Sequence, residues 1–84
     1  MRGVQIRLLL FAVLRDIVGQ SELELTLAEG TTAAQVWNQV RAPHPELRTY
    51  ELPPMTAVNL AYVPPQTILR HGDEVAFIPP VAGG

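Results

Sequence analysis

The fold is decided by residues 22–40, ELELTLAEGTTAAQVWNQV, in which a strand pattern gives way to a helix pattern. The first six residues alternate between polar and apolar side chains, with the period of two that is typical of a half-buried strand. The leucines are therefore predicted to face a core, and the residues between them to face water. Glu29-Gly30 follows as a turn before the helix begins.

The helix carries its own start and stop signals. Thr32 with Gln35 three residues later forms a capping-box signature, and the helix should end before Pro43, since a residue that precedes proline avoids helical angles. Its apolar residues at helical spacing are Ala33, Val36, Trp37 and Val40. We interpret Trp37, the only tryptophan, as a core anchor that docks the helix on a sheet rather than as a binding residue.

On the N-terminal side, residues 4–11 form an apolar run that predicts a strand covered on both faces. Residues 12–18 should form a short helical turn that Gly19 ends, and a hairpin should then turn near residues 19–21 into the strand at residues 22–27. The apolar run is too short for a membrane helix and has no small-residue cleavage site behind it. We therefore expect neither a membrane span nor a signal peptide.

On the C-terminal side, residues 43–55 carry four prolines and predict a long connection with a short helical turn near residues 46–51. Residues 56–63 then predict one strand, with Val58, Leu60 and Tyr62 on one face. Residues 67–69 are expected to form a short edge segment. A turn at residues 71–73 leads into the last strand, at residues 74–78.

This order of elements predicts an α+β fold with a mixed sheet of about five strands and one main helix packed on one face. The first and last strands should lie side by side and parallel, because a helix separates them in the sequence. The arrangement is the β-grasp, or ubiquitin-like, fold. A length of 84 residues permits one domain, which we place at residues 1–80, followed by a flexible Gly-Gly tail at residues 81–84.

Composition and motifs exclude several kinds of site. There is no cysteine, so a disulfide framework, a thiolate metal site and a thiol nucleophile are excluded. The six basic residues are scattered arginines and the net charge is −2, which argues against nucleic-acid binding. His44 and His71 lack metal-ligand spacing, Ser21 lacks a nucleophile context, and Asp73-Glu74 flanks a turn. We expect no metal, no active site made of side chains, and a cytoplasmic location.

The remaining reactive group is the carboxylate that follows IPPVAGG, residues 78–84. The prolines stiffen the exit from the last strand, and Gly83 and Gly84 have no Cβ, so they fit a narrow passage. Such an end suits insertion into another protein's active site. Once activated, for example as an acyl-adenylate, the carboxylate can accept sulfur as a thiocarboxylate or an amine as an isopeptide bond. The opposing reading is that the glycines are inert.

Three stretches carry a resemblance to a known family. Residues 11–16 (FAVLRD), 57–63 (AVNLAYV) and 69–84 (LRHGDEVAFIPPVAGG) resemble the small subunit of molybdopterin synthase. Asp16 stands where glutamate is expected, and Ala82 where serine is common. Pro64-Pro65 and Arg70-His71 lie where the family is often more acidic. These departures concern the detail of the partner surface and not the chemistry of the tail.

The resemblance implies a cytoplasmic sulfur carrier in molybdenum cofactor biosynthesis. An adenylating enzyme of the ubiquitin-activating type would use ATP on the carboxylate of Gly84, and a sulfurtransferase would convert it into a thiocarboxylate. The large synthase subunit would receive the tail and pass the sulfur to cyclic pyranopterin monophosphate, within a heterotetramer of small and large subunits. Nucleotide binding would belong to the activating partner, and no cofactor would be bound permanently. The chain would be a non-catalytic, sulfur-donating subunit of a sulfurtransferase, which leaves open whether it counts as an enzyme.

The same resemblance assigns roles to the last residues of the chain. Gly84 would carry the adenylate and then the sulfur, and the residues of the inserted tail would be Gly83, Ala82 and Val81. Partner docking would fall to Phe77, Pro79 and Pro80. Phe77 is equally expected in the core, because alternate residues of a strand face inward.

Three alternatives stay open at this point. One is a related carrier for thiamine thiazole synthesis or tRNA thiolation, which uses the same chemistry with another acceptor. Another is a ubiquitin-like protein modifier, although a chain without lysine cannot link to copies of itself through a lysine side chain. The last is an interaction domain with an inert tail.

Overall fold

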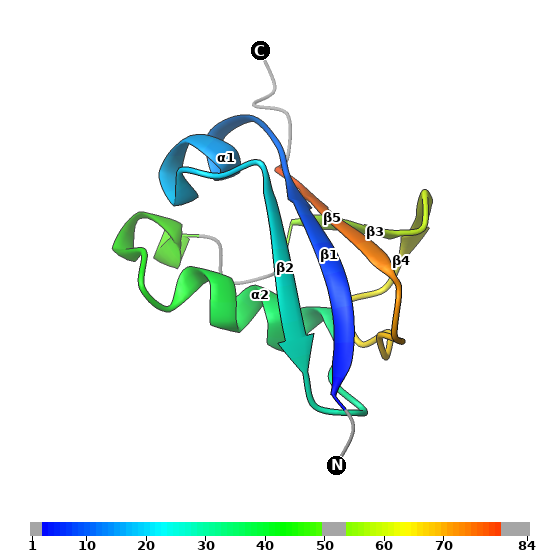
Figure 1. The fold of residues 1–84 in the computed structure, drawn as a ribbon. Helices are drawn as coiled ribbons and strands as arrows, with labels where there is room; N and C mark the ends of the chain where they lie inside the picture. The colour runs from blue at the N-terminus through cyan, green and yellow to red at the C-terminus, as the bar shows by residue number, and fades with distance from the viewer. Residues whose placement is uncertain (1–2, 50–53, 80–84) are drawn as a thin grey trace.

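The computed structural model of the chain describes residues 3–49 and 54–79, which fold around a single sheet (Figure 1). The sheet has five strands in the order β2-β1-β5-β3-β4. In chain order the elements are β1 (Val4–Leu10), α1 (Ala12–Val18), β2 (Glu22–Leu27), α2 (Ala33–Arg41), the 3₁₀ helix η1 (Pro45–Thr49), β3 (Met55–Val58), β4 (Ala61–Val63) and β5 (Glu74–Ile78). β1 and β5 are parallel in the centre, and the other neighbours are antiparallel. The predicted α+β, β-grasp arrangement is confirmed.

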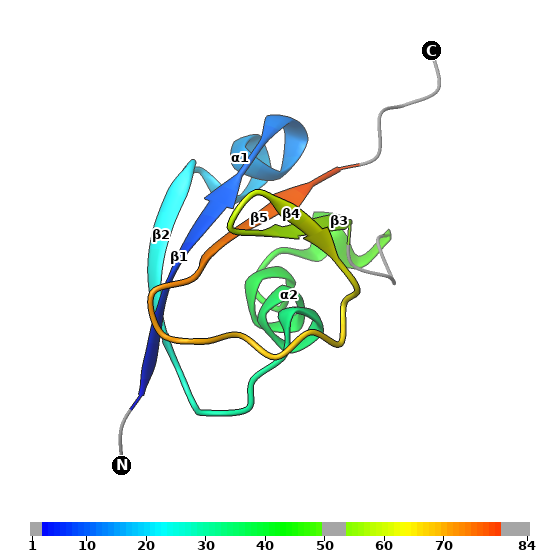
Figure 2. The ribbon, with the colours of Figure 1, turned by 90° about the vertical axis from the view of Figure 1, so that its right-hand side faces the viewer.

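The helix α2 lies across one face of the sheet and builds the core there (Figure 2). Trp37 is buried and its ring meets that of Phe77 edge-on, with the centroids 5.3 Å apart and the planes at 68°. The capping box also forms: the Gln35 amide donates to the Thr32 hydroxyl at 3.2 Å, and the Thr32 amide donates to the Gln35 side chain at 2.9 Å. The predictions for the start of this helix, for its end at Arg41 and for Trp37 are confirmed.

The stretch predicted as one strand at residues 56–63 is a hairpin, so that prediction is wrong. Asn59 and Leu60 both have positive φ, 52° and 72°, as the two-residue hairpin turns that match the twist of the sheet require. The Asn59 side chain accepts from the Glu74 amide at 3.0 Å and donates to the Asp73 carboxylate at 2.9 Å. Leu60 lies at the tip of the turn and is 93% exposed, so it does not share a strand face with Val58 and Tyr62 as predicted.

Two further expectations about strands need correction. β1 is not covered on both faces: Ile6 and Leu8 lie under α2, whereas Gln5 and Arg7 are exposed. Residues 67–69 make a single bridge, Thr32 to Ile68, instead of an edge strand. Carbonyls of this loop accept from the first amides of α2, Thr67 O from Ala33 N at 3.0 Å and Pro65 O from Ala34 N at 2.8 Å. The segment caps a helix whose first amides have no partner within the helix.

The connecting segments agree more closely with the sequence-based predictions. α1 ends at Gly19, whose φ of 86° is the left-handed conformation that glycine adopts readily. The turn at residues 71–73 precedes β5 as expected, with Gly72 at φ 87°. The helical turn expected near residues 46–51 is η1, and residues 50–53 lie outside the described residues. Within residues 3–49 and 54–79, no helix is long and apolar enough to span a membrane.

Candidate functional site

The face of the sheet opposite α2, here called the open face, carries the candidate site. β5 runs parallel to β1, and both strands end at the end of the sheet beside α1 (Figures 1 and 2). We call this the tail-side end, because β5 ends there at Ile78 and the chain continues through Pro79 toward the sequence-predicted tail. The last described strand thus ends at the tail-side end of the sheet.

An apolar row crosses the open face near this end. Leu9 lies opposite Ala76, Ala76 opposite Ala57, and Ala57 opposite Tyr62, so one row spans β1, β5, β3 and β4. Directly opposite residues in a sheet share a face. A second, shorter row pairs Met55 with Ile78. The tail-side apolar surface consists of Leu9, Met55, Ala57, Tyr62, Ala76 and Ile78.

Two side chains of this surface are open to water, whereas Leu9, Ala76 and Ile78 are half-buried and Ala57 is buried. Met55 is 51% exposed and Tyr62 is 67% exposed, although both are large side chains. Phe11 and Val13, which lie at the start of α1 beside the same end of the sheet, are 45% and 40% exposed. A contiguous group of exposed apolar side chains marks an interaction surface more often than an isolated one does.

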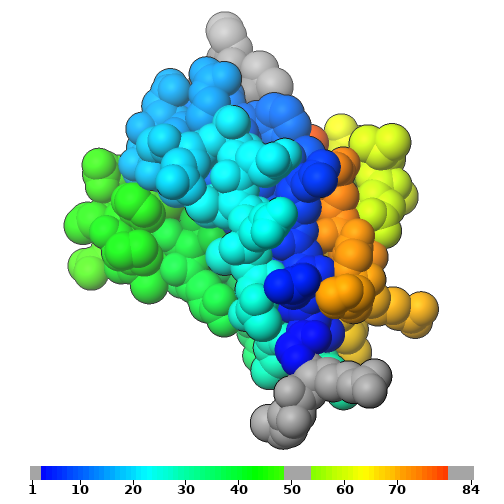
Figure 3. Space-filling model, in the orientation of Figure 1, coloured from blue at the N-terminus to red at the C-terminus, as the bar shows by residue number. Residues whose placement is uncertain are grey.

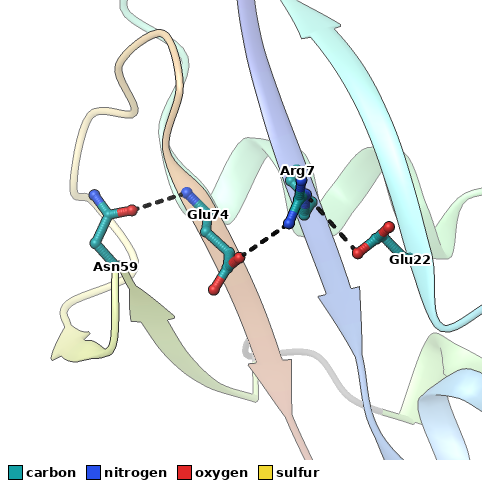
Figure 4. Close-up of polar contacts among 4 residues, drawn as sticks. All are labelled: Arg7, Glu22, Asn59 and Glu74. Atoms are coloured by element: carbon teal, nitrogen blue, oxygen red, sulfur yellow. Dashed lines mark hydrogen bonds and ion pairs between the residues drawn. The ribbon is translucent and has the colours of Figure 1, made fainter.

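The next row of the open face is charged instead. Arg7 lies opposite Glu24 on one side and opposite Glu74 on the other. Its guanidinium is 3.5 Å from the Glu74 carboxylate and 3.8 Å from that of Glu22 (Figure 4). The Arg7 side chain is 53% exposed, and exposed ion pairs of this kind contribute about 0–1 kcal/mol. This row therefore limits the apolar surface to the tail-side end and adds little stability.

The other polar residues singled out in the sequence have local structural contacts. His71 Nδ1 accepts from the Gln5 amide at 3.1 Å. Asp73 holds the turn before β5, because its carboxylate accepts from the Arg70 amide at 2.8 Å and from the Asn59 side chain. Among the described residues, no group of three or more histidines and carboxylates is placed to hold a metal ion.

The structure separates the sequence-predicted site residues. Phe77 is fully buried against Trp37, so its side chain belongs to the core, and the expected docking role for it is wrong. The reason is the alternation of β5, which turns residues 75 and 77 inward and residues 76 and 78 outward. Pro79 follows the strand and is half-buried. Pro80, Val81, Ala82, Gly83 and Gly84 lie outside the described residues, so their roles remain predictions.

Sequence reasoning missed the tail-side apolar surface, although signals for it were present. Since Val75 and Phe77 face the core, Ala76 and Ile78 had to face the other way. Leu9 was hidden within an apolar run, because a leucine on either side of it made the run look buried on both faces. Met55 had no such signal, since its place depends on pairing with β5.

Comparison with known proteins identifies relatives along nearly the whole chain. The model of the ThiS family matches residues 8–84. A molybdopterin synthase sulfur carrier subunit from Chlamydomonas reinhardtii is 39% identical over 83 residues, covering 96% of this chain and 100% of that protein. A protein of the same name from Mycobacterium tuberculosis is 34% identical, covering 96% of this chain and 99% of its own length.

Solved structures share the fold. The solution structure of the Haloferax volcanii HVO 2177 protein has a TM-score of 0.85 at 28% identity and covers 98% of this chain and 88% of that one. A complex of subunits 1 and 2 of molybdopterin-converting factor from Helicobacter pylori includes a chain with a TM-score of 0.61 at 16% identity, covering 96% of this chain and 100% of that one. The second likeness concerns the fold alone.

Proposed function

The chain belongs to the ThiS family, and from this premise we propose that it is the sulfur-carrier small subunit of a molybdopterin synthase. The observation that carries the proposal is the 39% identity to the Chlamydomonas reinhardtii subunit over that protein's whole length. The family match extends through residue 84, so it includes the two final glycines.

In this proposal the reactive group is the carboxylate of Gly84. A carboxylate is a poor electrophile, so an adenylating enzyme first joins it to AMP from ATP and releases pyrophosphate. Sulfur carried as a persulfide by a sulfurtransferase then displaces AMP, and a thiol reductant cleaves the resulting sulfur–sulfur bond, which leaves a thiocarboxylate. In the large subunit, the thiocarboxylate bonds through its sulfur to cyclic pyranopterin monophosphate. Water then cleaves the acyl–sulfur bond, which leaves the sulfur on the acceptor and returns Gly84 to a carboxylate. We place this cycle in the cytoplasm.

The fold supports this role by giving the tail a rigid base. β5 is held on both sides inside the sheet, by the parallel strand β1 and the antiparallel strand β3. Phe77, one residue before the end of β5, is fixed in the core against Trp37. Six extended residues beyond Ile78 span roughly 20 Å, at about 3.3–3.6 Å per residue. A reactive group at that distance from a fixed strand can enter a partner's cavity while the domain stays outside it.

The partner in this proposal is the large synthase subunit, joined in a heterotetramer. The Helicobacter pylori complex shows a chain of this fold bound to a second subunit of that system. We assign the tail-side apolar surface to this contact, with Met55 and Ile78 at its centre, because it surrounds the point from which the tail leaves. Pro79 lies at the edge of the same contact, followed by Pro80, Val81, Ala82 and Gly83 along the passage to the acceptor.

Reconstitution tests this function against its alternatives. The purified chain is incubated with adenylating enzyme, sulfurtransferase, ATP and sulfur donor, then with the large subunit and cyclic pyranopterin monophosphate. We expect molybdopterin to form with the wild-type chain and not with a chain that lacks Gly84. A Glu29→Gln variant, altered in an exposed turn at the end of the sheet opposite the end of β5, serves as the matched control and should retain activity.

Three outcomes would contradict the proposal. Transfer of sulfur only to a thiamine thiazole precursor or to tRNA would identify a different carrier. Lysine-linked adducts that end in Gly84 would identify a protein modifier. Full molybdopterin formation by the chain without Gly84 would show that the tail is not the reactive group.

A further inference from the structure

The strand β2 is a free edge of the sheet, on the side away from β3 and β4. The Leu10 amide donates to Ser21 O at 3.0 Å, which sets the phase of the antiparallel ladder between β1 and β2. From that point the main-chain groups of Leu23 and Leu25 point toward β1, and those of Glu22, Glu24 and Thr26 point away from the sheet. Six residues without proline or glycine thus present a pairing edge to solvent.

A small hollow runs along this edge, between β2 and the end of α2. Its volume is about 250 Å³, below the range of roughly 300–1,000 Å³ typical of small-molecule sites. It is lined by five apolar residues and two polar ones: Val18, Leu23, Leu25, Val40 and Pro43, with Gln39 and His44. Figure 3 shows β2 (cyan) on the surface beside the green segments of α2 and η1. The size and lining suit one or two inserted apolar side chains.

The leucines of β2 show that the core is incomplete here. Leu23 and Leu25 point toward the helix side of the sheet but remain only partly buried, whereas Leu8 and Leu10 on β1 are 0% and 1% exposed. The difference arises because β1 has strands on both sides and β2 has one on a single side. A strand added beside β2 would cover both the free main-chain groups and these leucines.

The charges of β2 define what such a strand would look like. Glu22 and Glu24 project on the open face, where a strand paired with β2 would place alternate side chains opposite them. Basic residues there would meet carboxylates, while the residues between them would turn toward the apolar hollow. A second copy suits this edge less well, because β2 has no basic residue to place opposite Glu22 or Glu24, and pairing about Glu24 sets like charges directly opposite.

We propose that the free edge of β2 is a second docking site, which binds an extended segment of a partner protein with alternating basic and apolar residues. The opposite edge of the sheet is less suited to this, since β4 has only three residues and is followed by Pro64-Pro65. The proposed site uses no part of the tail, so it does not depend on the proposed sulfur chemistry.

Nuclear magnetic resonance on the full-length chain tests the site with a defined probe. The probe is a capped hexapeptide of alternating lysine and valine, and its control is the same peptide with glutamate in place of lysine. We expect saturable shifts of the amides of residues 22–26 and of the methyl groups of Val18 and Val40 with the lysine peptide. The glutamate peptide should produce none at the same concentration.

Variants separate pairing along the edge from charge. Glu24→Lys should weaken binding of the lysine peptide about fivefold and allow the glutamate peptide to bind, because it reverses the charge of one partner in a cross-strand pair. Glu29→Lys makes the same charge change beyond the strand and should leave both affinities within about twofold. Glu24→Pro removes an outward amide and should weaken binding roughly tenfold. Unchanged Trp37 indole and core methyl signals verify that each variant is folded.

Four results would overturn the proposal. Equal binding of the two peptides would show that Glu22 and Glu24 do not select a basic partner. Shifts confined to Met55 and Ile78 would place the peptide on the tail-side apolar surface instead. Shifts at β2 that depend on protein concentration without peptide would make a second copy the occupant. Absence of any saturable shift at residues 22–26 would show that the edge is not a docking site. Sulfur transfer by the Glu24→Lys variant should be normal whichever of these results is obtained. A failure of the docking-site proposal is therefore distinct from a failure of the proposed function.

Discussion

Successive residues of β5 lie in opposite environments. Val75 and Phe77 are completely buried beneath α2, while Ala76 and Ile78 lie on the open face next to exposed Met55 and Tyr62. The covered face holds the domain together, and the open face has apolar side chains that the described residues leave exposed. One strand thus serves stability with one side and contact with the other. Changes on the two faces should therefore affect different measurements.

The largest expected effect lies on the covered face. Phe77→Ala removes the ring that packs on Trp37 and leaves a cavity, which should lower the free energy of unfolding by about 3–5 kcal/mol. Urea denaturation followed by tryptophan fluorescence measures this directly. At a temperature where the variant is still folded, its thiocarboxylate should form normally. A variant of wild-type stability would contradict the assignment of Phe77 to the core.

The next effect belongs to the tail-side end of the open face. Ile78→Asp places a charge on the tail-side apolar surface and should weaken binding to the large subunit roughly tenfold or more, since charges at the centre of an interface are costly to desolvate. Calorimetric titration gives the affinity, and thermal unfolding should be almost unchanged.

Ile68→Asp is the matched control for this prediction. Ile68 is also an exposed isoleucine, 58% accessible, but it lies beside Thr32 at the start of α2, away from the tail-side end. Its replacement should leave the affinity for the large subunit unchanged. Equal losses from the two variants would mean that the partner does not distinguish the tail-side apolar surface from the loop at the start of α2.

The smallest effect is expected in the charged row. Arg7→Ala breaks two exposed ion pairs, with Glu22 and Glu74, and should change the free energy of unfolding by less than about 1 kcal/mol. The affinity for the large subunit should change less than it does for Ile78→Asp. A larger loss of binding from Arg7→Ala would move the centre of the contact from the apolar row to the charged row.

The sequence predicted those parts of the fold whose signals are local. The capping box at Thr32, the alternation of residues 22–27 and the glycine at position 19 all act through neighbouring residues, and each appears in the structure as expected. The failures depended on distant pairing. Residues 56–63 read as one strand because the turn at Asn59 is stabilised from β5, by Asp73 and Glu74, far away in the sequence.

The candidate site divides in the same way, between residues with local signals and residues that distant strand pairing brings together. The tail stays a prediction from the residues IPPVAGG, because its chemistry would reside in its own atoms and residues 80–84 lie outside the described residues. The surface around its exit could not be predicted, because Leu9, Met55 and Tyr62 meet only when β1, β3 and β4 are placed around β5. Phe77 was assigned to both roles in the sequence, and only its packing against Trp37 decided between them.

The central claim is that the reactive group is the carboxylate of Gly84. It is tested most directly by intact mass spectrometry of the full-length chain after incubation with adenylating enzyme, ATP, sulfurtransferase and sulfur donor, with fragmentation to locate any change. We predict a species whose mass has increased by the exchange of one oxygen for one sulfur, located at Gly84 and absent when ATP is omitted. A chain that keeps its original mass under these conditions, or that gains sulfur at another residue, would contradict the account.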